Sequence, residues 1–152
     1  MQAFERPFQV AWAHLDANGH MANTAYLDIA VDVRFAYFAS RGFPPEEFRR
    51  RRIGPVVRRD EVDYLRELHL LQPIRVNFLL AGLSEDASRF RIRNEIRRED
   101  GQVAARITSL GGWFDLEARK LIVPPDGLAE ALRGLTRAED FERLESSVRQ
   151  SA

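Results

Sequence analysis

Apolar residues recur at helical spacing over residues 24–41. Tyr26, Ile29 and Val33 fall on one face of such a helix, and other apolar side chains fill most of its remaining surface. A helix that is apolar on most sides has to be largely enclosed by the rest of the protein. Gly42 suits the position after the last helical residue, and the two prolines behind it prevent the helix from continuing. The pattern predicts one long, buried helix.

Alternating apolar and polar residues predict strands before and after this helix. A short alternation at residues 8–12 predicts a first strand, and strand-forming residues mixed with charges predict another over residues 56–68. Clear alternations follow at residues 74–80 and 90–96, and a return strand is expected over residues 102–115. We expect these later strands to include an antiparallel meander.

Two glycine-containing motifs mark turns and contacts in these strands. Asp100-Gly101 lies between two predicted strands and indicates a type I′ hairpin. Gly111-Gly112 lies inside the return strand, where it indicates a bulge or a close approach of another backbone.

Capping residues predict helices at the C-terminal end of the chain. Asp126 follows two prolines and is suited to cap a short helix. Thr136 and Glu139 form a capping-box pattern, which predicts a final polar helix over residues 137–149. We therefore expect a C-terminal helical tail over about residues 126–150.

The order of these elements predicts an α+β fold. A strand and a long helix come first, and further strands and short helices follow, without the alternation of a parallel βαβ unit. The chain has 152 residues, enough for one core, and we expect residues 1–152 to form a single domain. One sheet cannot enclose so apolar a helix and also protect its own edges. We therefore expect a dimer in which two sheets join.

Charge and composition narrow the classes of partner. Lysine plus arginine and aspartate plus glutamate number 23 each, so the balance of charge does not indicate a nucleic acid partner. The absence of cysteine excludes thiol nucleophiles and thiolate metal sites. Residues 1–12 carry charges where a signal peptide needs an apolar core, and no segment has about 18 uncharged apolar residues in a row. We expect a cytoplasmic protein with no membrane partner.

A polar loop leads into the long helix and concentrates reactive side chains. Asp16, His20 and the amides of Asn18 and Asn23 fall within eight residues of the expected helix start. Unpaired backbone N–H groups and the helix dipole favour negative charge there. A carboxylate beside such an anion hole can attack a carbonyl and stabilise the resulting oxyanion. Asp16 is also typical of a turn or helix cap, and with His14 and His20 it could form a two-histidine, one-carboxylate metal set.

The spacing of Asp16, His20, Asn23 and Tyr26 resembles the helix-entry motif of the hotdog-fold acyl-CoA thioesterases, in the 4-hydroxybenzoyl-CoA thioesterase-like family. The sequence looks closest to the bacterial branch that acts on fatty acyl-CoA. The likeness spans about residues 5–132, nearly the whole chain. It includes acidic residues and an arginine on the long helix, a strand and a strand ending: Asp28, Asp32, Arg34, residues 57–66 and Phe114-Asp115-Leu116.

This resemblance implies a hotdog fold, in which an antiparallel sheet wraps around the long helix. It implies a homodimer or homotetramer with an active site at each subunit interface. The implied reaction is hydrolysis of an acyl-CoA to the free acid and CoA, without a metal and without a cofactor beyond the substrate's own CoA. Asp16 would activate water or attack the thioester itself. The backbone N–H near Asn23 would bind the thioester oxygen, while His20 and the Asn23 side chain orient Asp16, water or substrate.

Substrate contacts are expected from several parts of the chain. Tyr26, Phe35 and Tyr64 are candidates for contacts with the acyl group. Coenzyme A carries three phosphates, and Arg58 and Arg59 are candidates to bind them. A run of four arginines at residues 49–52 is typical of a solvated face, although a phosphate contact is the alternative.

Two positions depart from relatives in this family. Ala22 stands where many members of the fatty acyl-CoA branch have a second asparagine, so one group is missing from the polar network. Asn23 stands where enzymes specific for hydroxybenzoyl substrates have tyrosine, which argues against that aromatic substrate. Two alternative functions therefore stay open. One is a hydratase or dehydratase of the same fold, and the other is a non-catalytic acyl-CoA-binding module, which Ala22 favours.

Overall fold

The computed structural model describes residues 2–148. The helices and strands in that range are, in chain order, β1 (Phe4–Gln9), η1 (Trp12–His14, a 3₁₀ turn), α1 (Asn23–Ser40), α2 (Pro45–Arg51), β2 (Ile53–Tyr64), β3 (Pro73–Ser84), β4 (Arg89–Arg98), β5 (Val103–Asp115), β6 (Lys120–Ile122), α3 (Asp126–Arg133) and β7 (Arg137–Leu144). The long helix predicted over residues 24–41 is α1, and its bounds are confirmed to within one residue at each end.

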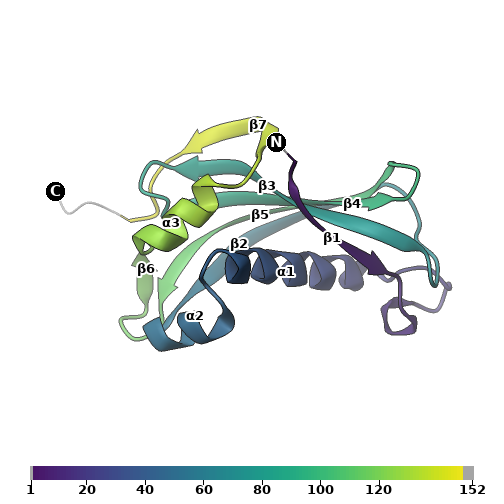
Figure 1. Cartoon of the computed structure of the whole chain (residues 1–152), viewed down its shortest axis with the longest axis horizontal. Helices are drawn as coiled ribbons and strands as arrows, with labels where there is room; N and C mark the ends of the chain where they lie inside the picture. The colour runs from purple at the N-terminus through teal and green to yellow at the C-terminus, as the bar shows by residue number, and fades with distance from the viewer. Residues whose placement is uncertain (1, 149–152) are drawn as a thin grey trace.

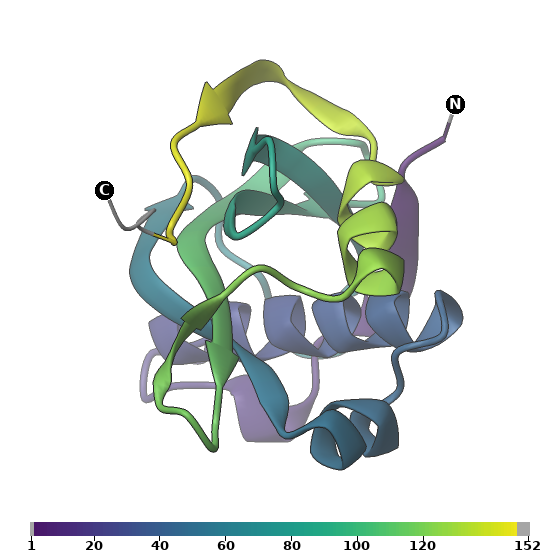
Figure 2. The ribbon, with the colours of Figure 1, turned by 90° about the vertical axis from the view of Figure 1, so that its left-hand side faces the viewer.

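The strands form one sheet in the order β1-β3-β4-β5-β2, and neighbours along this path are antiparallel. The short β6 adds to β5, and β7 adds to β3. The sheet arches over α1, which lies along one of its faces (Figures 1 and 2). An antiparallel sheet wrapped around one long helix confirms the predicted α+β hotdog architecture, including the meander of β3, β4 and β5.

The core lies between α1 and the sheet. Ile29 and Val33 of α1 are at most 2% exposed, and Phe78 of β3 and Trp113 of β5 are fully buried. Several apolar residues on another side of α1 are only partly buried within one chain: Leu27, Val31 and Phe35. One sheet therefore encloses α1 incompletely. In the part of the chain that the structure describes, no helix is long and apolar enough to span a membrane.

The first two strands begin earlier than the sequence pattern predicts. β1 starts at Phe4, and Trp12 lies in the 3₁₀ turn with 78% of its surface exposed. β2 starts at Ile53 and ends at Tyr64. Each strand contains a proline, Pro7 or Pro55. Proline is tolerated there because both strands lie at sheet edges, where an N–H is not needed for a second neighbour.

The hairpin between β4 and β5 has a three-residue loop, so the predicted type I′ turn is wrong. The Arg98 N–H donates to the Gln102 carbonyl at 2.9 Å, and the Gly101 N–H donates to the Arg98 carbonyl at 3.0 Å. Gly101 has φ of +85°, whereas Asp100 does not have positive φ. A type I′ turn needs positive φ at both central residues, and the observed pattern is that of a type I turn followed by a glycine bulge.

The segment after α3 is a strand, so the predicted helix over residues 137–149 is wrong. β7 runs parallel to β3. β1 pairs with β3 only as far as Phe78, and β7 covers the open edge that remains. The pairing of β7 with β3, which is distant in the sequence, overrides the local capping pattern. The helix end predicted at Arg149 lies outside the described residues. α3 confirms the predicted short helix, although Pro125 is its N-cap and Asp126 lies in its first turn.

The glycine pair in β5 allows the close backbone approach that the sequence predicts. A Cβ atom on Gly111 would collide with the carbonyl oxygen of Val56 in β2 and would lie 3.1 Å from the ring of Phe90. A Cβ atom on Gly112 would lie 2.8 Å from the carbonyl oxygen of Ser88. The contact between β2 and β5 therefore depends on the absence of a side chain at Gly111, and the approach of Ser88 to β5 depends on its absence at Gly112.

Replacing Gly111 with alanine is expected to lower the free energy of unfolding by about 2 kcal/mol or more, because the new methyl group has to push β2 away from β5. Gly54 provides a matched control in β2, since nothing lies within 4 Å of a Cβ atom built there and its φ is not positive. Gly54→Ala is expected to change stability by less than about 0.5 kcal/mol. Urea unfolding measures both, and equal effects would contradict the packing argument.

Candidate active site

The polar loop between η1 and α1 is closed by its own backbone. The Asp16 N–H donates to the His20 carbonyl at 2.9 Å, and the Gly19 N–H donates to the Asp16 carbonyl at 3.1 Å. Gly19 has φ of +76°, which a residue with a side chain rarely adopts. Further contacts fix the loop to the connection between β2 and β3: the Met21 N–H donates to the Leu68 carbonyl at 2.8 Å. The loop is therefore held on both sides before it enters α1.

Only one of the two Asp16 carboxylate oxygens accepts hydrogen bonds from this loop. Its Oδ1 atom accepts the Asn18 N–H at 2.9 Å and, more weakly, the His20 N–H at 3.4 Å. This is the turn-forming role that the residue type alone indicates, but Asp16 does not cap α1, whose N-cap is Ala22. Among the described residues, none donates a hydrogen bond to the other oxygen, Oδ2. One oxygen thus fixes the turn, while the second accepts no hydrogen bond from the described residues.

The first turn of α1 presents free N–H groups. Ala22 has no side chain that could accept a hydrogen bond, and within residues 2–148 the N–H groups of Asn23 and Thr24 have no acceptor. The start of an 18-residue helix carries partial positive charge, so these donors favour an anion. The Tyr64 hydroxyl donates to the Asn23 carbonyl at 2.9 Å and attaches the end of β2 to this turn.

A cavity of about 320 Å³ opens between the loop, the start of α1 and the end of β2; we call it the Asp16 cavity. Its lining residues are Asp16, His20, Met21, Asn23, Tyr26, Tyr64, Leu65, Arg66 and Glu67. Five of the eight residues predicted from the sequence therefore meet here. The rings of Tyr26 and Tyr64 touch edge to face, with centroids 5.3 Å apart.

Tyr26 is nearly buried beside this cavity. Burial raises its pKa, and the negative charge that Tyr64, Asp16 and Glu67 can carry raises it further. Its hydroxyl group therefore stays protonated near neutral pH and is available as a hydrogen-bond donor at the cavity wall.

Three predicted substrate contacts lie elsewhere. Phe35 lies on α1 twelve residues beyond Asn23, or about 18 Å along the helix axis. Arg58 and Arg59 lie on β2 and do not line the Asp16 cavity. Arg59 forms an exposed ion pair with Glu61 at 3.3 Å.

Two charged residues of the Asp16 cavity were not found from the sequence. Arg66 and Glu67 follow the end of β2, and the connection that carries them folds back over the loop. The strand predicted over residues 56–68 includes both residues, and its pattern did not indicate that β2 ends at Tyr64. For Arg66, no ion pair with an acidic side chain is formed within residues 2–148.

The metal set suggested by the sequence is not assembled. His14 lies at the end of η1, and its Nδ1 atom accepts the Ala11 N–H at 3.0 Å. Neither His14 nor Asp16 belongs to a group of three or more ligand-type side chains within the described residues. His20 points instead toward Glu67, with Nε2 3.4 Å from the Glu67 Oε2 atom.

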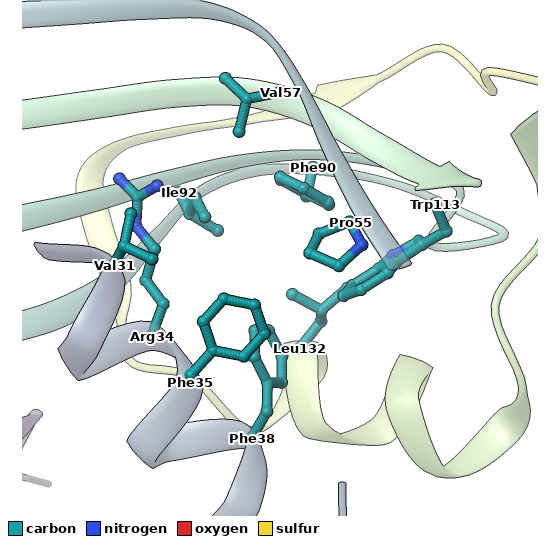
Figure 3. Close-up of a pocket in the computed structure, with 10 residues that line it drawn as sticks. All are labelled: Val31, Arg34, Phe35, Phe38, Pro55, Val57, Phe90, Ile92, Trp113 and Leu132. Atoms are coloured by element: carbon teal, nitrogen blue, oxygen red, sulfur yellow. The ribbon is translucent and has the colours of Figure 1, made fainter. Parts of the chain in front are cut away.

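A second cavity, of about 230 Å³, lies beside the C-terminal half of α1; we call it the apolar cavity (Figure 3). Phe35 and Phe38 face Pro55, Phe90 and Trp113 across it (Figure 3). The remaining lining residues are Val31, Arg34, Val57, Ile92 and Leu132. Apart from Arg34, the wall offers mainly apolar atoms and would bind an apolar group.

Arg34 is charged but only 5% exposed, and hydrogen bonds from its guanidinium group make this burial possible. Its Nε atom donates to Asn94 Oδ1 and its Nη2 atom to Ser109 Oγ, both at 2.8 Å. Ser109 in turn donates to Asp60 of β2. Burial lowers the pKa of Arg34 to about 10, and the nearby Asp60 opposes that shift. Arg34 therefore remains charged at neutral pH and connects α1 with β4 and β5.

Comparison with known proteins gives one family. A family model described as the thioesterase-like superfamily matches residues 10–132. The comparison with curated proteins finds no match.

Solved structures share the whole architecture. The protein SAV2348 from Staphylococcus aureus, solved in complex with CoA, superposes with a TM-score of 0.79 at 20% identity, over 99% of this chain and 96% of that one. Slr0204 from Synechocystis, a 1,4-dihydroxy-2-naphthoyl-CoA thioesterase, gives 0.78 at 20% identity over 88% and 98%. YbaW from Escherichia coli, a probable thioesterase, gives 0.72 at 21% identity over 88% and 98%. At these identities the likeness shows a common fold.

Replacing Arg34 with lysine is expected to lower the free energy of unfolding by about 2–3 kcal/mol, because lysine keeps the charge but cannot reproduce the two hydrogen bonds of the planar guanidinium. Arg59→Lys is the matched control, since Arg59 is 71% exposed in its ion pair. That change is expected to cost less than about 0.5 kcal/mol. Thermal and urea unfolding compare the two, and a stable Arg34→Lys protein would refute the structural role.

Proposed function

The chain belongs to the thioesterase-like superfamily, and from this premise we propose that it hydrolyses an acyl-CoA to a free acid and CoA, with Asp16 as the catalytic carboxylate. Membership of this family makes it a thioester hydrolase, whereas the acyl-CoA substrate and the catalytic residues are our proposal. The observation that carries the proposal is that Asp16, whose Oδ2 atom accepts no hydrogen bond within residues 2–148, lines the same cavity as Asn23, the first residue of α1, whose N–H has no acceptor in that range.

Asp16 can act in either of two ways from this position. As a general base, Oδ2 accepts a proton from water, the resulting hydroxide attacks the thioester carbon and the CoA thiolate leaves. As a nucleophile, Oδ2 attacks the same carbon, CoA leaves as thiolate and a mixed anhydride forms, which water then hydrolyses. A thiolate is a good leaving group, so both routes work without a serine or cysteine triad.

The start of α1 supplies the oxyanion site in this proposal. The negative charge that develops on the thioester oxygen is stabilised by the N–H groups of Asn23 and Thr24 and by the dipole of α1. His20 and the Asn23 side chain then orient water and substrate. Arg66 lines the same cavity without an acidic partner in the described chain, and we assign it a contact with a phosphate of CoA. The cytoplasmic location stays a prediction from the sequence.

A dimer joined through β2 would complete the site. β2 pairs with β5 on one side, and no described strand covers its other edge. Val57, Tyr64 and Leu65 on or next to this strand are each about half exposed, at 47%, 51% and 52%. A long exposed edge strand with apolar residues favours pairing with another strand. A second copy of β2 is the partner in this proposal. With a two-fold axis perpendicular to the sheet, both α1 helices lie on the same face of the joined sheet.

Such pairing brings the Asp16 cavity of one chain next to the apolar cavity of the other chain. Two β2 strands related in this way are antiparallel, so the Tyr64 end of one lies near the Pro55 end of the other. Tyr64 borders the Asp16 cavity, whereas Pro55 and Val57 border the apolar cavity. The CoA thioester would then react in the Asp16 cavity of one chain, while the apolar acyl group enters the apolar cavity of its partner.

Asp16→Asn is expected to lower the rate of thiol release from acyl-CoA by about 10²–10⁴-fold, because the amide can neither accept the proton nor attack the thioester. Asp100→Asn is a matched control. Asp100 forms the same turn, accepting the Gln102 N–H at 2.9 Å, but lies at the hairpin far along the chain. Thiol release is measured over a panel of acyl chain lengths. Hydrolysis by Asp16→Asn at the wild-type rate would refute the role of Asp16, and a change in enoyl absorbance without thiol release would indicate a hydratase.

The shared site can be tested by complementation between two inactive variants. Val57→Trp is expected to block the apolar cavity, since Val57 lies at its wall and is exposed enough to be enlarged without disturbing the core (Figure 3). Because Val57 also lies at the proposed dimer edge, size-exclusion chromatography first checks that the variant still forms dimers. Asp16→Asn and Val57→Trp chains, co-expressed with different tags, form a mixed dimer in which one site carries both changes and the other carries neither. Random mixing should therefore restore roughly a quarter of the wild-type rate. No recovery in a purified mixed dimer would contradict sites built from two chains.

A further inference from the structure

Two histidines and a glutamate converge beside the Asp16 cavity. His20 lies at the end of the polar loop, and Glu67 and His69 lie in the connection between β2 and β3. One ligand atom from each of the three side chains lies within 4.8 Å of the others. We call these residues the ligand cluster. Its residues come from two segments that are distant in the sequence, so no local sequence motif predicts the cluster.

The backbone holds the two segments of the ligand cluster against each other. His20 and His69 face each other in an isolated antiparallel bridge. The neighbouring Met21 N–H donates to the Leu68 carbonyl at 2.8 Å. The His69 N–H donates to the Gln72 side chain at 3.0 Å, which fixes the turn on the other side. The Cα positions of the cluster are therefore set before any ligand binds, and only side-chain rotations remain.

The spacing of the cluster suits a small transition-metal ion. Two ligands of a tetrahedral zinc ion, each about 2.0–2.1 Å from the metal, stand about 3.4 Å apart. The distance from His20 Nε2 to Glu67 Oε2 is 3.4 Å. The His20 and His69 rings lie 5.0 Å apart, and His69 is exposed, so a rotation of its side chain can bring its nitrogen into reach.

The donor groups of the ligand cluster favour transition-metal ions over Mg²⁺ and Ca²⁺. Two imidazoles and one carboxylate bind Zn²⁺ and neighbouring divalent ions, whereas Mg²⁺ and Ca²⁺ prefer oxygen ligands alone. The chain has three histidines and no cysteine, so thiolates cannot compete for such an ion. The Glu67 side chain is 67% exposed, which leaves the remaining coordination positions open to water.

We propose that His20, Glu67 and His69 form a binding site for Zn²⁺ or a similar divalent transition-metal ion, and that an ion bound there inhibits thioester hydrolysis. The second part rests on the proposed function, in which His20 orients water and substrate. An ion coordinated by the His20 ring takes the Nε2 lone pair and fixes the ring toward Glu67 and His69. His20 then cannot accept a hydrogen bond through Nε2 from water or substrate in the Asp16 cavity, which His20 and Glu67 both line. The ion is therefore a regulator of the reaction and takes no part in its chemistry.

Co²⁺ is the direct probe of this site, because its visible absorption reports coordination without any turnover. Wild type is expected to bind one Co²⁺ per chain, and Zn²⁺ should displace it. In His69→Gln the affinity should fall by at least about tenfold, since even a residue that only supports a metal ligand is worth about 10–100-fold. His14→Gln is the matched control, because His14 bonds to its own turn outside the cluster, and it should bind like wild type. Equal binding by His69→Gln, or no binding by wild type, would overturn the site.

The inhibition is tested on the same proteins with Zn²⁺ and acyl-CoA. Hydrolysis is followed by the loss of thioester absorbance, because thiol reagents and free CoA bind the metal themselves. Zn²⁺ should slow wild type by about tenfold or more, reversibly with a chelator, and leave His69→Gln at its own metal-free rate. Equal inhibition of both proteins would overturn the regulatory role. If no acyl-CoA is hydrolysed by wild type, the proposed function fails, while the Co²⁺ spectra still decide whether the metal site exists.

Discussion

The enclosure of α1 is the constraint on which the rest of the structure depends. The helix is apolar on most sides, and the sheet arches over it (Figure 2). Residues such as Ile29 and Val33 are buried there. A capping side chain at a helix start contributes about 1 kcal/mol, yet Ala22 offers none. Packing along the whole length of α1 can hold the helix without that contribution. Its first N–H groups are therefore free for another acceptor, at the place where the polar loop delivers Asp16.

Asp16 shows how a structural and a chemical role can occupy one side chain. Oδ1 fixes the turn by accepting the Asn18 N–H, and this contact also orients the carboxylate. Oδ2 accepts no hydrogen bond from the described residues, and Asp16 lines the same cavity as Asn23 and Tyr26. The turn-forming interpretation and the catalytic interpretation of this residue are thus compatible. The first is what the hydrogen bonds show, and the second is what the free oxygen and the empty helix start make chemically reasonable.

Local patterns predicted the helices and strands well where apolar, buried positions recur at a regular spacing. The helical spacing around Ile29 and the alternation around Ile92 correspond to α1 and β4. β7 was missed because its strand state depends on the open edge of β3, and a capping pattern at Thr136 cannot report an edge some fifty residues away. Glu67 and His69 were missed for a related reason, since they meet His20 only through a backbone bridge between distant segments.

Some of the predicted site also remains separated within one chain. Tyr26 and Tyr64 gather around Asp16, but Phe35 borders a different cavity about 18 Å along α1. An acyl-CoA needs a polar place for its reacting group and an apolar place for its chain, and a single chain keeps these at opposite ends of one helix. The edge of β2 that no described strand pairs with runs from one cavity to the other, with Val57 near one end and Tyr64 at the other. Closing that edge with a second copy would protect the strand, cover the half-exposed side of α1 and join the two cavities. In the dimer that we propose, the same physical requirement, enclosure of an apolar helix, would account for both the fold and the placement of the substrate between two chains.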